Sequence, residues 1–262
     1  MAEAEKRYAV ITGASKGIGK SIAIALAKRG YHLLLIARSG DELNRLSQEI
    51  GIQFNVDVNT LAIDLAQPKA AKNVSEWINQ QQYRIAVLVN NAGYGLWGAF
   101  AALNLEEQMQ MCQLNMDTVV RLSYLLLPLL SKEKQAYILN VSSTAAYQAV
   151  PTLAVYSATK AFVLSFTRAL RFELKNTPVS VTCLSPGPVD TGFAHRAGLD
   201  AFSKMAEKFN MKPDEVAEIA VKGMLNKKSE IVPGFTNIIS VYANRILPKA
   251  FIEKMAAGIY KT

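Results

Sequence analysis

The sequence predicts an α/β fold with a single Rossmann-type, doubly wound parallel sheet that is flanked by helices on both faces. Five apolar runs rich in Val, Ile and Leu recur along the chain, at residues 8–11, 32–36, 85–89, 137–141 and 179–184. Strands that are so continuously apolar are buried on both faces. The stretches between them have helical periodicity, and alternating strands and helices form a parallel sheet joined by right-handed crossovers.

Weaker patterns predict the remaining elements. Two further strands are expected around 53–63 and near 229–232, and helices are expected at 105–130, 154–175 and 214–225. Residues 187–212, which begin PGPVDTG, interrupt the alternation and are predicted to form a lid over a substrate site. Because no Pro/Gly/Ser-rich linker divides the chain, we expect one catalytic domain over residues 1–262.

A helical extension is predicted at about 235–262. Its apolar residues recur at broadly helical spacing and are divided by Pro248. We expect this segment to pack in the core or between subunits. Contact with a membrane surface through an amphipathic helix is the alternative, because Arg245, Lys249 and Lys254 lie nearby.

Composition excludes several classes of protein. Half of the 262 residues are hydrophobic and 19% are charged, which argues against disorder, and no apolar run is long enough for an integral membrane segment. The net charge of +8 is concentrated in residues 160–262, but Lys and Arg are not interleaved with aromatic residues there, so no nucleic acid partner is expected. The two cysteines lack metal-ligand spacing, and the first residues lack the pattern of a secretory signal. These observations predict a cytoplasmic protein without a metal site.

Residues 12–21, TGASKGIGKS, fit three different motifs. They match a P-loop, provided that its first position can be Ala. They also match the nucleophile elbow of a serine hydrolase, with Ser15 as nucleophile, and a dinucleotide-binding turn. All three motifs require a strand, a tight turn and a helix. A P-loop enzyme needs a metal-binding Asp, for which Asp64 at a strand end is the candidate, and a hydrolase needs a later histidine, for which His195 is the candidate.

The dinucleotide interpretation explains more of the sequence. Gly13 permits the tight turn, Gly17 lets the backbone approach a pyrophosphate, and Gly19 lets helix and strand pack closely. About 20 residues later, at the end of the next strand, Arg38 stands where NAD-binding proteins place an acidic residue. Together with Lys16 in the turn, this guanidinium favours a 2′-phosphate, and so predicts NADP(H).

Tyr156 and Lys160 lie at positions i and i+4, one turn apart on one face of a predicted helix. A phenol with a pKa near 10 is a poor base at neutral pH. A nearby ammonium and a positively charged nicotinamide ring would favour the phenolate and suit this pair to general acid/base chemistry. The spacing alone also fits an ordinary exposed pair.

The order of these motifs resembles that of the short-chain dehydrogenase/reductase family. The matching segments are TGASKGIG at 12–19, NNAG at 90–93, Asn115, NVSS at 140–143, YSATK at 156–160 and PGPVDT at 186–191. The resemblance implies that Tyr156 is the general acid/base, Lys160 its electrostatic partner, Ser143 the hydroxyl that polarises the carbonyl, and Asn115 a holder of a proton-relay water. Ser143 is chosen over Ser142 because the family's serine lies thirteen residues before its tyrosine, and Ser142 is expected to be a structural hydrogen-bonding residue.

The resemblance also implies the residues that contact the cofactor. Besides Gly13, Lys16, Gly17, Gly19, Arg38, Tyr156 and Lys160, they are Ser15, Ile18, Asp64, Leu65, Asn91 and Val189. Asp64 fits equally well as a turn-forming or capping residue at the end of a strand. Asn90 is expected to brace the glycine turn.

The predicted function is an NADPH-dependent oxidoreductase that reduces a hydrophobic or lipid-like ketone or aldehyde to an alcohol, or the reverse. A serine hydrolase and a non-catalytic nucleotide-binding protein are the alternatives. The C-terminal segment resembles a branch of the family that includes fatty-acyl and hydroxysteroid-type reductases. Family resemblance also implies a homodimer or homotetramer joined by the helices at 105–130 and 154–175. The pocket is expected to be lined by residues 145–152, Tyr94, Leu96, Trp97, Phe100, Phe193 and Phe202.

Overall fold

The computed structural model describes residues 6–191 and 210–259, and within them seven strands form one parallel sheet. The strand order is β3-β2-β1-β4-β5-β6-β7. The doubly wound α/β class is therefore confirmed. The strands are β1 (Tyr8–Thr12), β2 (His32–Ala37), β3 (Val58–Ala62), β4 (Ile85–Asn90), β5 (Ala136–Val141), β6 (Val179–Leu184) and β7 (Glu230–Ile231).

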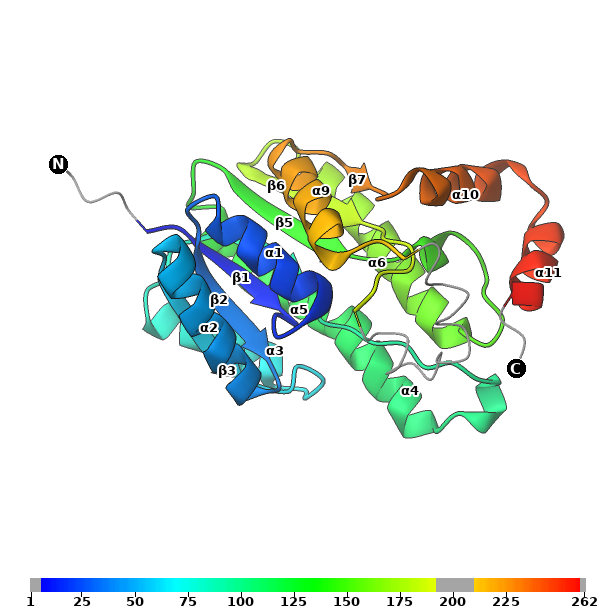
Figure 1. Cartoon of the computed structure of the whole chain (residues 1–262), viewed down its shortest axis with the longest axis horizontal. Coiled ribbons are helices and arrows are strands. Elements are labelled where there is room, and N and C mark those ends of the chain that lie inside the picture. The colour runs from blue at the N-terminus through cyan, green and yellow to red at the C-terminus, as the bar shows by residue number, and fades with distance from the viewer. Residues whose placement is uncertain (1–5, 192–209, 260–262) are drawn as a thin grey trace.

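Helices cover both faces of this sheet. Figure 1 shows α1, α2 and α9 in front of it, and α1 and α9 pack against each other. On the other face α3 packs against α5, and α6 packs along β5 and β6. The helices are α1 (Gly17–Ala27), α2 (Gly40–Phe54), α3 (Ala70–Gln80), α4 (Leu105–Cys112), α5 (Thr118–Leu130), α6 (Ala154–Glu173), α9 (Pro213–Leu225), α10 (Phe235–Ile246) and α11 (Lys249–Ile259).

Strand β2 shows how the sheet forms two apolar layers. Its side chains alternate, so Leu33 and Leu35 join the cluster beneath α1, α2 and α9, whereas Leu34 and Ile36 join the cluster beneath α3 and α5. All four are fully buried. Burial of each such side chain contributes about 1.5–3 kcal/mol, which explains why the strand sequence is apolar on both faces.

Two expected elements differ from the structure. The strand expected at 53–63 begins only at Val58, because helix α2 continues to Phe54 and ends at Asn55, whose φ of 52° places it in the left-handed region. The helix expected at 105–130 is interrupted between α4 and α5 by a π-helical turn, Gln113–Asp117. Extra turns of this kind occur often at functional sites.

The order of the strands reverses between β1 and β4, and Thr12 connects the carboxyl ends of these two strands. Its Oγ1 donates to the carbonyl of Val89 at 3.1 Å and accepts from the amides of Asn91 at 2.9 Å and Ala92 at 3.0 Å. In open α/β sheets the ligand site lies outside the carboxyl ends of the strands at such a reversal. The site is therefore sought at this edge.

The C-terminal segment forms two helices that are only partly packed in the core, and its expected packing between subunits stays a prediction. Val241, Ile252 and Ala256 are buried, but most of the other large apolar side chains of α10 are exposed. Figure 1 shows α10 and α11 at one end of the molecule, beyond β7. No helix of the described ranges is long and apolar enough to cross a membrane. Subunit contacts through α4, α5 and α6 stay a prediction.

Candidate active site

The glycine turn between β1 and α1 has the geometry of a phosphate-binding turn. Gly13 and Gly17 have positive φ angles of 64° and 58°, in the region that favours glycine. A Cβ atom on Gly19 would lie only 2.2 Å from the carbonyl oxygen of Gly13, so a larger residue there would push helix and strand apart. The predicted roles of Gly13 and Gly19 in turn and packing agree with this geometry.

The first turn of α1 is open to an anion. The residue before it, Lys16, caps the helix with no side-chain hydrogen bond, and the first turn contains no acidic residue. Free N–H groups and the positive end of the helix dipole favour a phosphate at this position. Ser15 and Ile18 lie in the same turn, so these residues fit the pyrophosphate of a dinucleotide.

Two basic residues flank the turn. Arg38 directly follows β2 and is exposed, and no residue of the described ranges forms an ion pair with it. The exposed Lys16 lies 3.6 Å from Glu42 Oε1 at the start of α2. Arg38 is therefore available to a ligand at the end of β2, whereas Lys16 would exchange a solvent-screened ion pair for a phosphate contact.

Two asparagines lie at the end of β4, and Asn90, the last residue of the strand, does not brace the glycine turn as expected. The expected contact of Asn91 with the cofactor stays a prediction. Asn91, not Asn90, braces the glycine turn, because its Nδ2 donates to the carbonyl oxygens of Thr12 at 2.9 Å and Gly13 at 3.2 Å. Asn90 is buried and its Nδ2 donates to Asn140 Oδ1 at 2.8 Å. The alternation of side chains along the strand sends these neighbours to opposite sides.

Three further predicted cofactor contacts lie at the same edge of the sheet. Asp64 forms a turn after β3, in which its Oδ1 accepts from the amide of Ala66 at 3.0 Å, leaving the second carboxylate oxygen for other partners. Leu65 is buried, and its carbonyl accepts from Thr118 Oγ1 at 2.8 Å. Val189 pairs with Met211 in a short parallel bridge next to the described ends of the predicted lid. Phe193, His195 and Phe202 lie outside the described residues.

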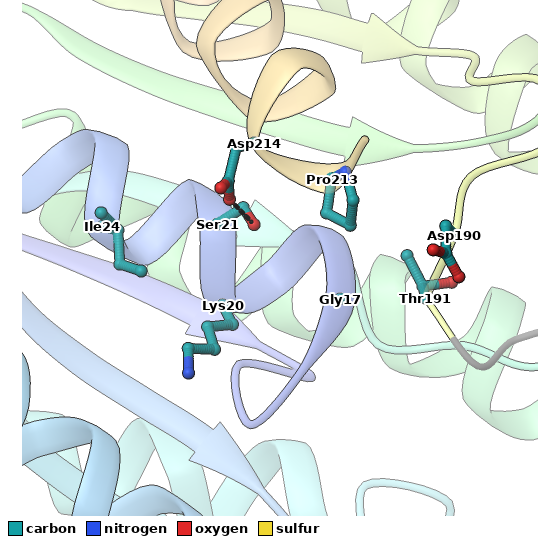
Figure 2. Close-up of a pocket in the computed structure, with 8 residues that line it drawn as sticks. All are labelled: Gly17, Lys20, Ser21, Ile24, Asp190, Thr191, Pro213 and Asp214. Atoms are coloured by element: carbon teal, nitrogen blue, oxygen red, sulfur yellow. Dashed lines mark hydrogen bonds between the residues drawn. The ribbon is translucent and has the colours of Figure 1, made fainter. Parts of the chain in front are cut away.

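Figure 2 shows a pocket that adjoins the glycine turn. It is lined by Gly17, Lys20, Ser21, Ile24, Asp190, Thr191, Pro213 and Asp214. Ser21 Oγ donates to Asp214 Oδ1 at 2.6 Å and so joins α1 to α9. On the opposite side, Thr191 approaches so closely that a Cβ on Gly17 would lie 2.9 Å from its Cβ. The pocket therefore lies at the phosphate end of the candidate cofactor site.

Tyr156 and Lys160 lie together on α6. The Lys160 ammonium is 5.8 Å from the centre of the Tyr156 ring, and both side chains are buried. Lys160 Nζ donates to the carbonyl of Val141, the last residue of β5, at 3.0 Å. In the opposite direction, Ser142 Oγ donates to the carbonyl of Lys160 at 2.7 Å. These two hydrogen bonds hold the Tyr156 turn of α6 at the carboxyl edge of the sheet.

Burial changes the titration of Lys160. It lowers the pKa of the ammonium from its ordinary value of 10.5 to about 8, because the charged form loses the solvation of water. Near neutral pH, the protonation state of a buried amine with this pKa is sensitive to the charge of a neighbouring ligand or phenol.

Ser143 begins the short turn η3 (Thr144–Tyr147), two residues after the strand whose end binds Lys160. Its Oγ accepts from the amide of Ala145 at 3.1 Å, which leaves its hydroxyl proton available to an acceptor. The far end of η3 is tied to β7, because the Tyr147 hydroxyl donates to Glu230 Oε1 at 2.6 Å. Ser142, by contrast, is buried and engaged with Lys160, as expected of a structural residue.

Asn115 lies in the π-helical turn and connects three segments. Its Nδ2 donates to the carbonyl of Tyr94 at 2.9 Å and to Thr159 Oγ1 at 3.0 Å, while its Oδ1 accepts from the amide of Tyr94 at 3.2 Å. A Cβ on Gly93 would lie 2.9 Å from Asn115 Oδ1 and 3.4 Å from Lys160 Nζ. Asn115 and Lys160 are therefore neighbours across the backbone of Gly93.

This edge thus combines an open glycine turn with a Tyr-Lys pair one helical turn apart. A family model described as short chain dehydrogenase matches residues 7–202, well over half of the sequence. The chain belongs to the short-chain dehydrogenase family.

Relatives of this short-chain dehydrogenase agree with that assignment. The very-long-chain 3-oxoacyl-CoA reductase of Bos taurus is 36% identical over 260 residues, which cover 95% of this chain and 83% of that protein. A short-chain dehydrogenase from Sphingobium yanoikuyae, solved in complex with NADPH, has a TM-score of 0.82 at 28% identity and covers 97% of this chain and 94% of that one. A short-chain dehydrogenase/reductase from Burkholderia phymatum, solved in complex with NAD, shares the fold with a TM-score of 0.82 at 22% identity. The match covers 92% of this chain and 94% of that one.

The family assignment makes the protein an oxidoreductase with a nicotinamide dinucleotide as cofactor. It gives no support to a serine hydrolase that uses Ser15. That residue lies instead in the turn where this short-chain dehydrogenase is open to phosphate.

Three residues of the site were missed by sequence reasoning. Thr12 links β1 to β4, Gly93 leaves room between Asn115 and Lys160, and Thr159 links Asn115 to α6. All three lie inside the quoted motifs TGASKGIG, NNAG and YSATK. The motifs therefore indicated that these positions belong to the site, but only the contacts in the structure show what each residue does there.

The buried lysine predicts a pH dependence of stability in this short-chain dehydrogenase. Below about pH 8 the Lys160 amine is protonated in both the folded and the unfolded chain. Between about 8 and 10.5 the unfolded chain binds more protons, so the Lys160 contribution to the free energy of unfolding rises with pH, by at most about 1.4 kcal/mol per pH unit.

Denaturant unfolding of the wild type and of Lys160→Met at about pH 7.5 and about pH 9.5 measures this contribution. The stability of the wild type relative to the variant is expected to increase at the higher pH. Comparison with the variant also separates the contribution of Lys160 from that of Cys183. Burial raises the pKa of the Cys183 thiol to about 11, so its contribution to the free energy of unfolding falls as pH rises. An equal difference at both pH values would contradict the prediction.

Proposed function

We propose that this protein is an NADPH-dependent oxidoreductase that reduces a hydrophobic or lipid-like ketone or aldehyde to an alcohol, or catalyses the reverse reaction. The observation that carries the proposal is the position of the Tyr156 phenol beside the buried ammonium of Lys160 at the carboxyl edge of the sheet. The glycine turn that fits a dinucleotide lies at the same edge.

The bound nicotinamide would supply the hydride to the carbonyl carbon. As negative charge develops on the carbonyl oxygen, the hydroxyl groups of Ser143 and Tyr156 would donate hydrogen bonds to it. Donors aimed at a developing charge stabilise the transition state more than the ground state. Tyr156 would then transfer its proton to the oxygen, completing the alcohol.

Lys160 would make Tyr156 competent for this transfer. Its positive charge favours the phenolate that remains after the proton has left, and burial strengthens the interaction because little water screens it. Asn115, which lies next to Lys160 across Gly93, would hold a water through which the proton is replaced from solvent.

Arg38 and Lys16 support the preference for NADPH. The end of β2 presents the Arg38 guanidinium in place of a carboxylate, and a guanidinium can bind a 2′-phosphate with two hydrogen bonds. Binding of NADPH by the Sphingobium yanoikuyae structure is consistent with this preference.

The surroundings of Tyr156 support a hydrophobic substrate. Its ring belongs to an apolar cluster that also contains Met111, Val150, Leu153, Tyr94, Leu96, Trp97, Ala145 and Val155. Phe100 is exposed and lies outside this cluster, so its expected place in the pocket wall stays a prediction. The name of the Bos taurus relative, a very-long-chain 3-oxoacyl-CoA reductase, points to the same class of compound. Acyl thioesters, steroids and simple aldehydes form the panel to be screened by the loss of NADPH absorbance.

Replacement of Tyr156 by Phe is expected to lower kcat by about a hundredfold or more, since it removes both the proton donor and a hydrogen bond to the oxygen. Thermal shift with NADPH should stay near that of the wild type, because the phenyl ring keeps its packing. The exposed Tyr124 on α5 provides a matched control, and Tyr124→Phe is expected to retain wild-type turnover. Substantial turnover by Tyr156→Phe would assign the proton transfer to another group.

Replacement of Arg38 by Asp is expected to move cofactor preference towards NADH by about tenfold or more. The carboxylate repels the 2′-phosphate of NADPH and accepts a hydrogen bond from the ribose 2′-hydroxyl of NADH. The ratio of kcat/KM for the two cofactors measures the change. Arg45→Asp makes the same charge change at an exposed position within α2, and should leave the ratio unaltered. An unchanged ratio in Arg38→Asp would remove Arg38 from the 2′-phosphate site.

A further inference from the structure

Helix α10 carries an apolar stripe on its outward face. The stripe consists of Phe235, Ile238, Ile239, Tyr242 and Ile246, which are separated by steps of three, one, three and four residues. Their exposed fractions range from 37% to 82%. At 100° per residue these five positions occupy an arc of about 100°, the width of the apolar face of an amphipathic helix.

The opposite side of α10 fixes this orientation. Val241 is buried, and Asn237 Nδ2 donates to the carbonyl of Pro233 at 2.7 Å. Asn237 also packs so closely on Gly187 that a Cβ there would lie 2.3 Å from Asn237 Oδ1. Because this side is packed on the body of the protein, the apolar stripe is directed away from it.

Basic residues follow the stripe in the sequence. Helix α10 contains no acidic residue, and α11 begins with the exposed Lys249 and continues with the exposed Phe251 and Lys254. Residues 235–259 contain three basic residues and one acidic residue, Glu253. An apolar helix face with adjacent lysines is complementary to a surface that has an apolar interior and anionic headgroups.

We propose that the apolar stripe of α10 docks this protein on the surface of an anionic lipid bilayer, with Lys249 and Lys254 at the headgroups. A second copy of the chain complements this surface less well. In a two-fold symmetric contact, the stripe of a second copy is accompanied by the same excess of basic residues, so it offers Lys249 and Lys254 no surface of opposite charge. Anionic lipid, in contrast, strengthens binding by about fivefold for each lysine near the surface.

Sedimentation of the whole protein with vesicles tests the proposal. One set of vesicles contains phosphatidylcholine only, and the other contains phosphatidylcholine with phosphatidylserine. The wild type is expected to bind the second set at least tenfold more strongly, and added salt should weaken this binding. Binding needs no turnover, so the result is independent of the proposed reaction.

Two variants with the same chemical change locate the binding surface. Ile246→Asp places a carboxylate in the stripe, whereas Ile52→Asp places one at an equally exposed position on α2, with exposures of 82% and 86%. The first is expected to weaken binding to anionic vesicles by about tenfold or more and the second to leave it unchanged. Because both positions are exposed, both variants should keep the circular dichroism spectrum of the wild type.

The double variant Lys249→Gln, Lys254→Gln should lose about tenfold or more of the binding to anionic vesicles. Failure of the wild type to bind anionic vesicles would overturn the proposal, as would equal losses in Ile246→Asp and Ile52→Asp. Sedimentation velocity without lipid tests the alternative that a second copy of the chain covers the stripe. If the wild type does not bind vesicles and Ile246→Asp turns a dimer into a monomer, the stripe is an interface between copies.

Discussion

The site depends on one buried ammonium group and the carbonyl that accepts its hydrogen bond. Lys160 is excluded from water, so its amine needs a partner, and the end of β5 provides the carbonyl of Val141. Ser142 returns a hydrogen bond to the backbone of Lys160. This pair of bonds joins helix to strand, and it sets Tyr156 and the Ser143 turn at one edge of the sheet. The chemistry proposed for the protein follows from that arrangement.

The cofactor side of the same edge is organised by backbone and small residues. Thr12 and Asn91 hold the ends of β1 and β4 together, and the glycines keep helix α1 close enough to present its N–H groups. The hydride-transferring ring and the acid/base pair must meet within a few ångströms for catalysis. Hydrogen bonds that fix both halves to the carboxyl ends of neighbouring strands provide this preorganisation, with the π-helical turn of Asn115 as a further connection.

Much of this organisation could be predicted from the sequence, because the features concerned are local or repeat with a fixed period. Buried strands such as β2 are apolar on both faces, and Tyr156 and Lys160 share a helix face by their spacing alone. Contacts between distant segments could not be predicted. Asn90 and Asn91 are chemically identical neighbours, and only the pleat of β4 decides which one reaches the glycine turn. Likewise, periodicity identifies an apolar face on α10, but not whether the body of the protein covers it.

The central claim is that the charge of Lys160 enables Tyr156 to transfer a proton. The pH dependence of alcohol oxidation in the wild type and in Lys160→Met tests it most directly, with the alcohol of the most reactive carbonyl of the panel and saturating NADP⁺. The account predicts half-maximal rate in the wild type well below about pH 10, the ordinary range of a phenol, and a shift to higher pH by about one unit or more in the variant. The same pH profile in both proteins would contradict it.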